Sequence, residues 1–204
     1  VPTYPCTDEN VICVGAVDNR GEITEFSNFG GKVDVLAPGE SIVSTYPQDS
    51  VESRILRIRG YEVKNGTSQA APFVAALAAT LKLAYPEITN DELRARIYSS
   101  AQKTTSSDDK FSLYGMINFK KALENTPESF IAVNVKDLLE VNFDYKTKSF
   151  QFPVYLKSLI KDEKDIQVEV SFDREDIVLT QKSETLNLTS GRTSRMIVKG
   201  NLTD

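Results

Sequence analysis

The spacing of apolar residues changes near residue 126. Before it, short apolar runs rich in β-branched residues alternate with helical patterns, which is typical of buried parallel strands joined by helices. The expected strands of this first part are residues 11–17, 33–37, 41–46 and 54–59, the last of them an edge strand. The pattern predicts an α/β domain over residues 1–126, with a mostly parallel sheet.

The most distinct helix of this first part is expected over residues 68–86. Its residues are apolar on all sides and carry no charge before Lys82, which is typical of a helix buried all round. Pro72 falls near the first turn, where a missing backbone N–H does little harm. Two further helices are expected over residues 89–101, which open with the capping-box pair Thr89 and Glu92, and over residues 118–124.

Beyond Pro127 the apolar residues follow a period of two. The expected strands are residues 130–135, 150–156, 166–172, 177–179 and 195–198. Turn residues separate these runs and no long helix intervenes. The pattern predicts a small antiparallel β-sandwich over residues 127–204.

Composition excludes several classes of function. The chain has 204 residues, a formal net charge of −5 and no histidine. Neither half is basic, which argues against a nucleic-acid or anionic-membrane partner. Without histidine, this chain alone can supply neither an imidazole base nor a His-ligated metal. No apolar run approaches the roughly 18–20 residues of a membrane span.

The segment with candidate chemistry is Asn65-Gly-Thr-Ser-Gln-Ala-Ala-Pro72. Its glycine lets the backbone pass tightly into the expected helix, so that Ser68 lies at the helix N-terminus. Unpaired N–H groups and the positive end of the helix dipole suit a developing oxyanion there. The spacing fits equally well with Thr67 or Ser68 as an ordinary N-cap.

This segment resembles the nucleophile signature of the subtilisin-like serine proteases. Five further motifs occur in the matching order: Val14-Gly-Ala-Val-Asp18, Phe26-Ser-Asn-Phe-Gly30, Val35-Leu-Ala-Pro-Gly39, Ile42-Val-Ser-Thr45 and Tyr114-Gly-Met-Ile-Asn118. The resemblance covers about residues 10–126. It implies the C-terminal part of a doubly wound, mostly parallel sheet.

The resemblance also implies roles for the motif residues. Ser68 is the expected nucleophile and its own N–H an oxyanion donor, with Thr67 as a neighbouring contributor. Asn65 and Gly66 belong to the loop that presents the serine. Gln69 departs from the family pattern, which has methionine at this position.

The largest departure is that the family's Asp, His and oxyanion Asn all lie upstream of the strand that matches residues 11–17. The chain alone is therefore expected to be inactive as a protease. The expected partner is an N-terminal half carrying Asp and His, and the expected substrate is a protein or peptide. Without that half, the sheet edge and the helix at 68–86 should be left partly exposed. The alternative is a non-catalytic fragment or pseudoprotease whose β-sandwich is a binding or structural module.

Other features concern environment and cofactors. The resemblance implies an extracellular or cell-surface location. In that oxidising environment Cys6 and Cys13 could form a disulfide. The alternative is a buried thiol at Cys13 and a loop thiol at Cys6. No redox or organic cofactor is implied. Some relatives bind structural calcium, and Asp18 matches one weak cation position, although it fits a plain turn aspartate as well.

Overall fold

The computed structural model describes residues 4–47, 60–104, 110–134 and 141–203. The expected strand at 54–59 lies outside these residues. The chain divides into two compact units. The α/β unit comprises Ile12–Ile88 and Arg96–Thr126, and the β-rich unit comprises Val1–Val11, Thr89–Ala95 and Pro127–Asp204.

The α/β unit contains a three-stranded parallel sheet in the order β1-β2-β5. Its strands are β1 (Val14–Val17), β2 (Val35–Pro38) and β5 (Gly115–Met116). Val14 lies opposite Val35 in the β1–β2 pair. The side chains of β1 and β2 are almost entirely buried, in agreement with their β-branched and small residues. The mixed α/β character with parallel strands is thus confirmed.

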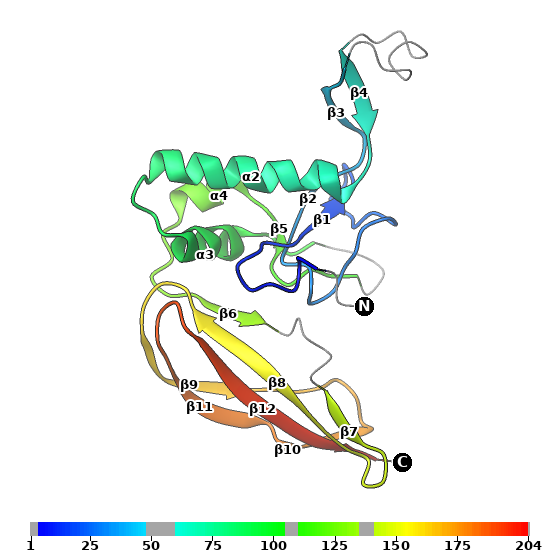
Figure 1. The fold of residues 1–204 in the computed structure, drawn as a ribbon, viewed down its shortest axis with the longest axis vertical. Coiled ribbons are helices and arrows are strands. Elements are labelled where there is room, and N and C mark those ends of the chain that lie inside the picture. The colour runs from blue at the N-terminus through cyan, green and yellow to red at the C-terminus, as the bar shows by residue number, and fades with distance from the viewer. Residues whose placement is uncertain (1–3, 48–59, 105–109, 135–140, 204) are drawn as a thin grey trace. The chain divides into compact units, whose positions relative to one another are not determined.

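An antiparallel hairpin of β3 (Ile42–Thr45) and β4 (Tyr61–Lys64) follows β2 and leads to the N-terminal end of helix α2 (Figure 1). Strand β4 is not among the expected strands although its residues, Tyr61-Glu-Val-Lys64, alternate between apolar and charged, because a run of only four residues is a weak signal.

Helix α2 (Thr67–Ala84) begins and ends within two residues of expectation, and in this chain it is not buried on all sides. Only one face is buried, formed by Ala70, Val74, Leu77 and Leu81. The opposite face is exposed and includes Ala71, Pro72, Ala75, Ala76, Ala79 and Leu83. Leu83 has 86% of its surface exposed. The described residues therefore cover only one face of an apolar helix.

The other helices have clear sequence causes. Helix α3 (Asn90–Ser100) begins with a capping box in which Thr89 Oγ1 accepts from the N–H of Glu92, and the Glu92 carboxylate accepts from the N–H of Thr89 at 2.8 Å. Helix α4 (Phe119–Glu124) is capped by Asn118, whose side chain accepts from the N–H of Lys121 at 2.9 Å.

The β-rich unit contains two antiparallel sheets. One has the order β10-β12-β8-β6 with β7 also paired to β8, and the other pairs β9 with β11. The strands are β6 (Ile131–Asn134), β7 (Asn142–Asp144), β8 (Ser149–Ser158), β9 (Glu163–Glu169), β10 (Ile177–Gln181), β11 (Ser183–Leu188) and β12 (Thr193–Leu202). Their shared core is formed by Val154, Leu156, Leu188, Met196 and Val198. Strands β7 and β11 are not among the expected strands, because β7 has only three residues and β11 is largely polar.

In the parts of the chain that the structure describes, no helix is both long enough and apolar enough to cross a membrane.

Candidate nucleophile loop

Ser68 is the second residue of helix α2. The N-cap of this helix is Gly66, and no side chain caps it. The interpretation of Thr67 or Ser68 as an ordinary N-cap is therefore wrong. Ser68 is exposed and its hydroxyl does not cap the helix.

Gly66 makes the turn into the helix possible. Its backbone angles are φ 152° and ψ 158°, a region that is populated essentially by glycine alone. A Cβ at this position would lie 2.7 Å from Oε1 of Gln69. The side chain of Gln69, half-buried where the family has methionine, thus folds back over the glycine beside the candidate nucleophile.

The loop after β2 is hydrogen-bonded to residues 65–68, the candidate nucleophile loop. The N–H of Gly66 donates to the carbonyl of Gly39 at 2.8 Å. A Cβ at Gly39 would lie 2.6 Å from Cβ of Ala16 and 2.8 Å from the carbonyl oxygen of Gly66, so the two backbones need a glycine here to come this close.

Asn65 makes a second hydrogen bond between the loop after β2 and the candidate nucleophile loop. Its side-chain oxygen accepts the N–H of Ser41 at 2.7 Å. Sequence reasoning missed Gly39 and Ser41 as partners of the nucleophile loop. The Pro38-Gly39 pair marked only the end of a strand, and spacing along the chain does not reveal a contact across 24 residues.

The first turn of α2 presents donor groups next to the Ser68 hydroxyl. The N–H groups of Gln69 and Ala70 both donate to the carbonyl of Gly66, at 3.0 and 3.3 Å. The N–H groups of Thr67 and Ser68 have no backbone acceptor among the described residues. Unpaired N–H groups at the positive end of an 18-residue helix are suited to stabilise a negative oxygen.

Asp18, the candidate cation ligand, has its carboxylate occupied by nitrogen donors. Its Oδ1 accepts the N–H of Glu22 at 2.9 Å and of Arg20 at 2.8 Å, and its Oδ2 accepts from Nε of Arg20 at 3.0 Å. The bond from the Glu22 N–H, above all, lowers the pKa of Asp18. Asp18 is a turn residue here, and the described residues contain no cluster of three or more His, Cys, Asp or Glu side chains that could hold a metal.

Both cysteines of the chain, Cys6 and Cys13, are disulfide-bonded. No free thiol remains among the described residues. The disulfide alternative for this pair is therefore the one that the structure shows.

Comparison with known proteins identifies the family of this chain. A sequence profile of the subtilase family matches residues 1–116, which include the whole nucleophile loop. The chain belongs to the subtilase family. Subtilisin DY of Bacillus licheniformis is 36% identical over 121 residues, which make up 59% of this chain and 40% of that protein. The halolysin-like extracellular serine protease Nep of Natrialba magadii is 29% identical over 127 residues, 62% of this chain and 21% of that protein.

A solved structure of a protease is similar in fold. A protease from Pseudoalteromonas arctica superposes with a TM-score of 0.51 at 27% identity, covering 61% of this chain and 38% of that chain. This subtilase chain thus spans less than half the length of each of these relatives.

Proposed function

We propose that the chain is the C-terminal part of a subtilisin-like serine endopeptidase in which Ser68 is the nucleophile. Ser68 Oγ attacks the carbonyl carbon of the scissile peptide bond, and its proton passes to a histidine. The amine product leaves with that proton, and water then hydrolyses the acyl-enzyme. The observation that carries this proposal is the exposed Ser68 hydroxyl in the first turn of α2, uncommitted to any cap.

The N–H of Ser68 is the proposed oxyanion donor from this chain, with Thr67 beside it. Both N–H groups lack a backbone acceptor among the described residues, so they are available to a substrate oxygen. Asn65 and Gly66 hold the loop in the conformation that presents the serine. The contacts to Ser41 and Gly39 fix these two residues in turn.

An upstream half of the same domain supplies the rest of the site. It carries the histidine, the aspartate that orients it and the oxyanion asparagine, since this chain has no histidine at all. Two structural observations support this partner. The alanine-rich face of α2 is exposed, and β1 forms an edge of the sheet among the described strands. The upstream half covers both and extends the sheet to a doubly wound one.

The chain alone is inactive on this proposal. Without a base, the hydroxyl of Ser68 keeps its proton and is a poor nucleophile. Loss of a single oxyanion asparagine in a subtilisin already costs about 10²–10³ in kcat, and here the base is absent as well.

The same proposal places residues 1–126 in the catalytic domain and residues 127–204 in a β-sandwich. It also places the protein outside the cell or at its surface. A disulfide-bonded Cys6 and Cys13 and the extracellular relative Nep support this location.

Hydrolysis of a denatured protein substrate tests the proposal. The 204-residue chain is assayed alone, after assembly with the upstream half of its domain, and as the assembled Ser68→Ala variant. Only the assembled wild type should cleave, with kcat falling by about 10⁶-fold in Ser68→Ala. Cleavage that survives Ser68→Ala overturns the assignment of the nucleophile, and an inactive wild-type assembly favours the pseudoprotease alternative.

A further inference from the structure

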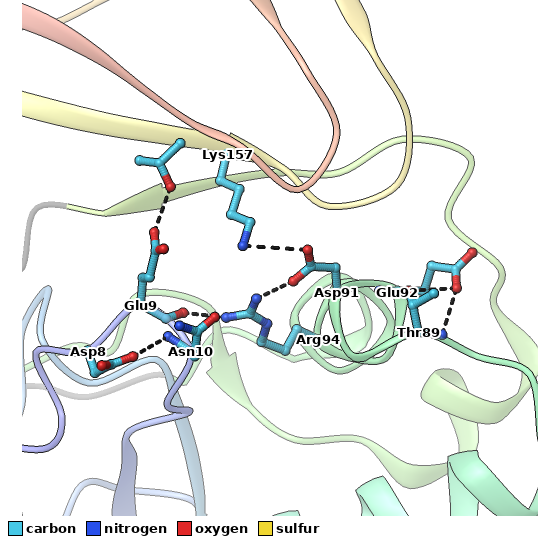
Figure 2. A network of polar contacts seen from close by, with 9 residues as sticks. Asp8, Glu9, Asn10, Thr89, Asp91, Glu92, Arg94 and Lys157 are labelled. Atoms are coloured by element: carbon cyan, nitrogen blue, oxygen red, sulfur yellow. Dashed lines mark hydrogen bonds and ion pairs between the residues drawn. The ribbon is translucent and has the colours of Figure 1, made fainter.

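The β-rich unit is assembled from three segments that are far apart in the sequence. Its strands come from Pro127–Asp204, but the short segments Val1–Val11 and Thr89–Ala95 belong to the same unit. Both short segments lie within the region that matches the subtilase family, whereas the strands lie beyond it. A polar network links all three (Figure 2).

Asp91, in the first turn of α3, is the centre of this network. Its Oδ1 accepts from the guanidinium of Arg94, and its Oδ2 lies 3.5 Å from Nζ of Lys157 on β8. The guanidinium of Arg94 also donates to the backbone carbonyl of Glu9. Asp91 therefore contacts β8 through Lys157 and is linked to the N-terminal segment through Arg94.

A second link runs directly from β12 to the N-terminal segment. Thr193 Oγ1 donates to the carboxylate of Glu9 at 2.6 Å. Gly191, just before β12, donates its N–H to the carbonyl of Ser158 at 2.9 Å, and a Cβ on it would lie 3.6 Å from Oδ2 of Asp91. Glu9 is thus held by its backbone and by its side chain, from two different segments.

The three charged side chains around Asp91 are partly shielded from solvent, whereas Glu9 and Thr193 are exposed. The side chains of Arg94, Lys157 and Asp91 are only 9%, 13% and 24% exposed. For comparison, the Lys182–Glu169 pair in the same unit has exposures of 60% and 65%. An exposed ion pair contributes little to stability, whereas removing one partner of a shielded ion pair costs more, because the remaining charge is less well solvated. The network around Asp91 therefore favours one arrangement of its three segments.

We propose that the β-strands of residues 127–204 act as a brace that fixes residues 4–11 of the N-terminal segment through the Asp91-centred network. The braced segment leads directly into β1 of the subtilase sheet. On this proposal, one role of the β-structure is to hold the segment that precedes β1 in place.

Hydrogen–deuterium exchange of the 204-residue chain tests the brace. Within the braced segment, the N–H groups of Asp8 and Val11 donate to backbone carbonyls, and that of Asn10 donates to the Asp8 side chain. These amides report on the order of the segment. The variants are Lys157→Met, Thr193→Val and, as a matched control that breaks an exposed pair, Lys182→Met.

Lys157→Met should speed exchange at these amides by about 10-fold, and Thr193→Val by about fivefold, while the β8 and β12 amides stay unchanged. Lys182→Met should match the wild type. Unchanged exchange in the N-terminal segment overturns the proposal, and so does an equal acceleration throughout the unit. If Lys157→Met does not fold, Thr193→Val decides the question, because it removes a single exposed hydroxyl.

Discussion

The backbone N–H of Ser41 donates to the side-chain oxygen of Asn65 at 2.7 Å. This bond joins the residue that precedes β3 to the residue that follows β4, three positions before Ser68. Ser41 has a φ of 55°, which is uncommon for a residue other than glycine, and the bond to Asn65 helps to hold it there. The loop that precedes Ser68 is thus held by a residue 24 positions before Asn65 in the sequence.

Replacing Asn65 with alanine should destabilise the nucleophile loop. Asn65→Ala removes the acceptor for the N–H of Ser41, so the free energy of unfolding should fall by about 1 kcal/mol. Asn65→Asp keeps an oxygen acceptor and serves as the control, with a smaller loss. Urea denaturation followed by circular dichroism measures both. An Asn65→Ala variant as stable as the wild type would show that the bond contributes nothing.

Gly66→Ala should have a larger effect, because the backbone of Gly66 lies in a region reserved for glycine. We expect the free energy of unfolding to fall by about 1–3 kcal/mol and the start of α2 to shift. Gly21→Ala is the matched control. Gly21 also has a positive φ, of 81°, but nothing lies within 4 Å of the added Cβ. Thermal unfolding of the two variants should show a clearly greater loss for Gly66→Ala, and equal losses would argue against a special role of the loop.

The exposed face of α2 should be needed for assembly and not for the stability of this chain. Ala75→Glu changes an exposed residue, so its free energy of unfolding should stay within about 0.5 kcal/mol of the wild type. It should nevertheless abolish association with the upstream half, because it places a charge in the proposed contact. Leu77→Ala, on the buried face, should lower stability by about 2–5 kcal/mol. Co-purification of the two halves measures association, and undiminished recovery with Ala75→Glu would contradict the proposed contact.

The Asp18 turn should lose stability in acid. Hydrogen bonds from the N–H of Glu22, then of Arg20, hold the pKa of Asp18 below its ordinary value of 3.8. Because the folded pKa is the lower one, the ionised carboxylate stabilises the turn above this ordinary pKa of 3.8, which applies to the unfolded chain. That stabilisation disappears as the pH falls through the folded pKa.

The Asp18→Asn variant isolates this effect. Asp18→Asn should be less stable than the wild type at about pH 6, where the wild-type carboxylate is ionised. This difference in the free energy of unfolding should shrink as the pH falls below about 4. Equilibrium unfolding across this range provides the measurement. A difference that is constant with pH would mean that the charge of Asp18 has no part in the turn.

The sequence was sufficient for features that depend on local interactions. The capping box of Thr89 and Glu92 was predicted from its spacing and is present in the structure, because both its bonds are made within one helical turn. Helix α2 was placed within two residues at each end, since a long uncharged run has few alternatives.

Features that depend on distant partners were not predictable. The one-sided burial of α2 is decided by what packs against the helix, and no residue of the helix itself encodes that. Strand β11 pairs with β9 in spite of a polar sequence, because its Leu186 and Leu188 reach the core of the unit. The support of Asn65 by Ser41, and of Glu9 by Thr193, likewise arises from tertiary structure alone.

Reaction with a fluorophosphonate probe, followed by peptide mapping, tests the central claim most directly. The probe forms a covalent bond only with a serine that a neighbouring base activates. We predict a tag on Ser68 when the chain is assembled with its upstream half, and none on the chain alone or on the assembled Ser68→Ala variant. A tag on another serine, or a wild-type assembly that stays unlabelled, would contradict the account.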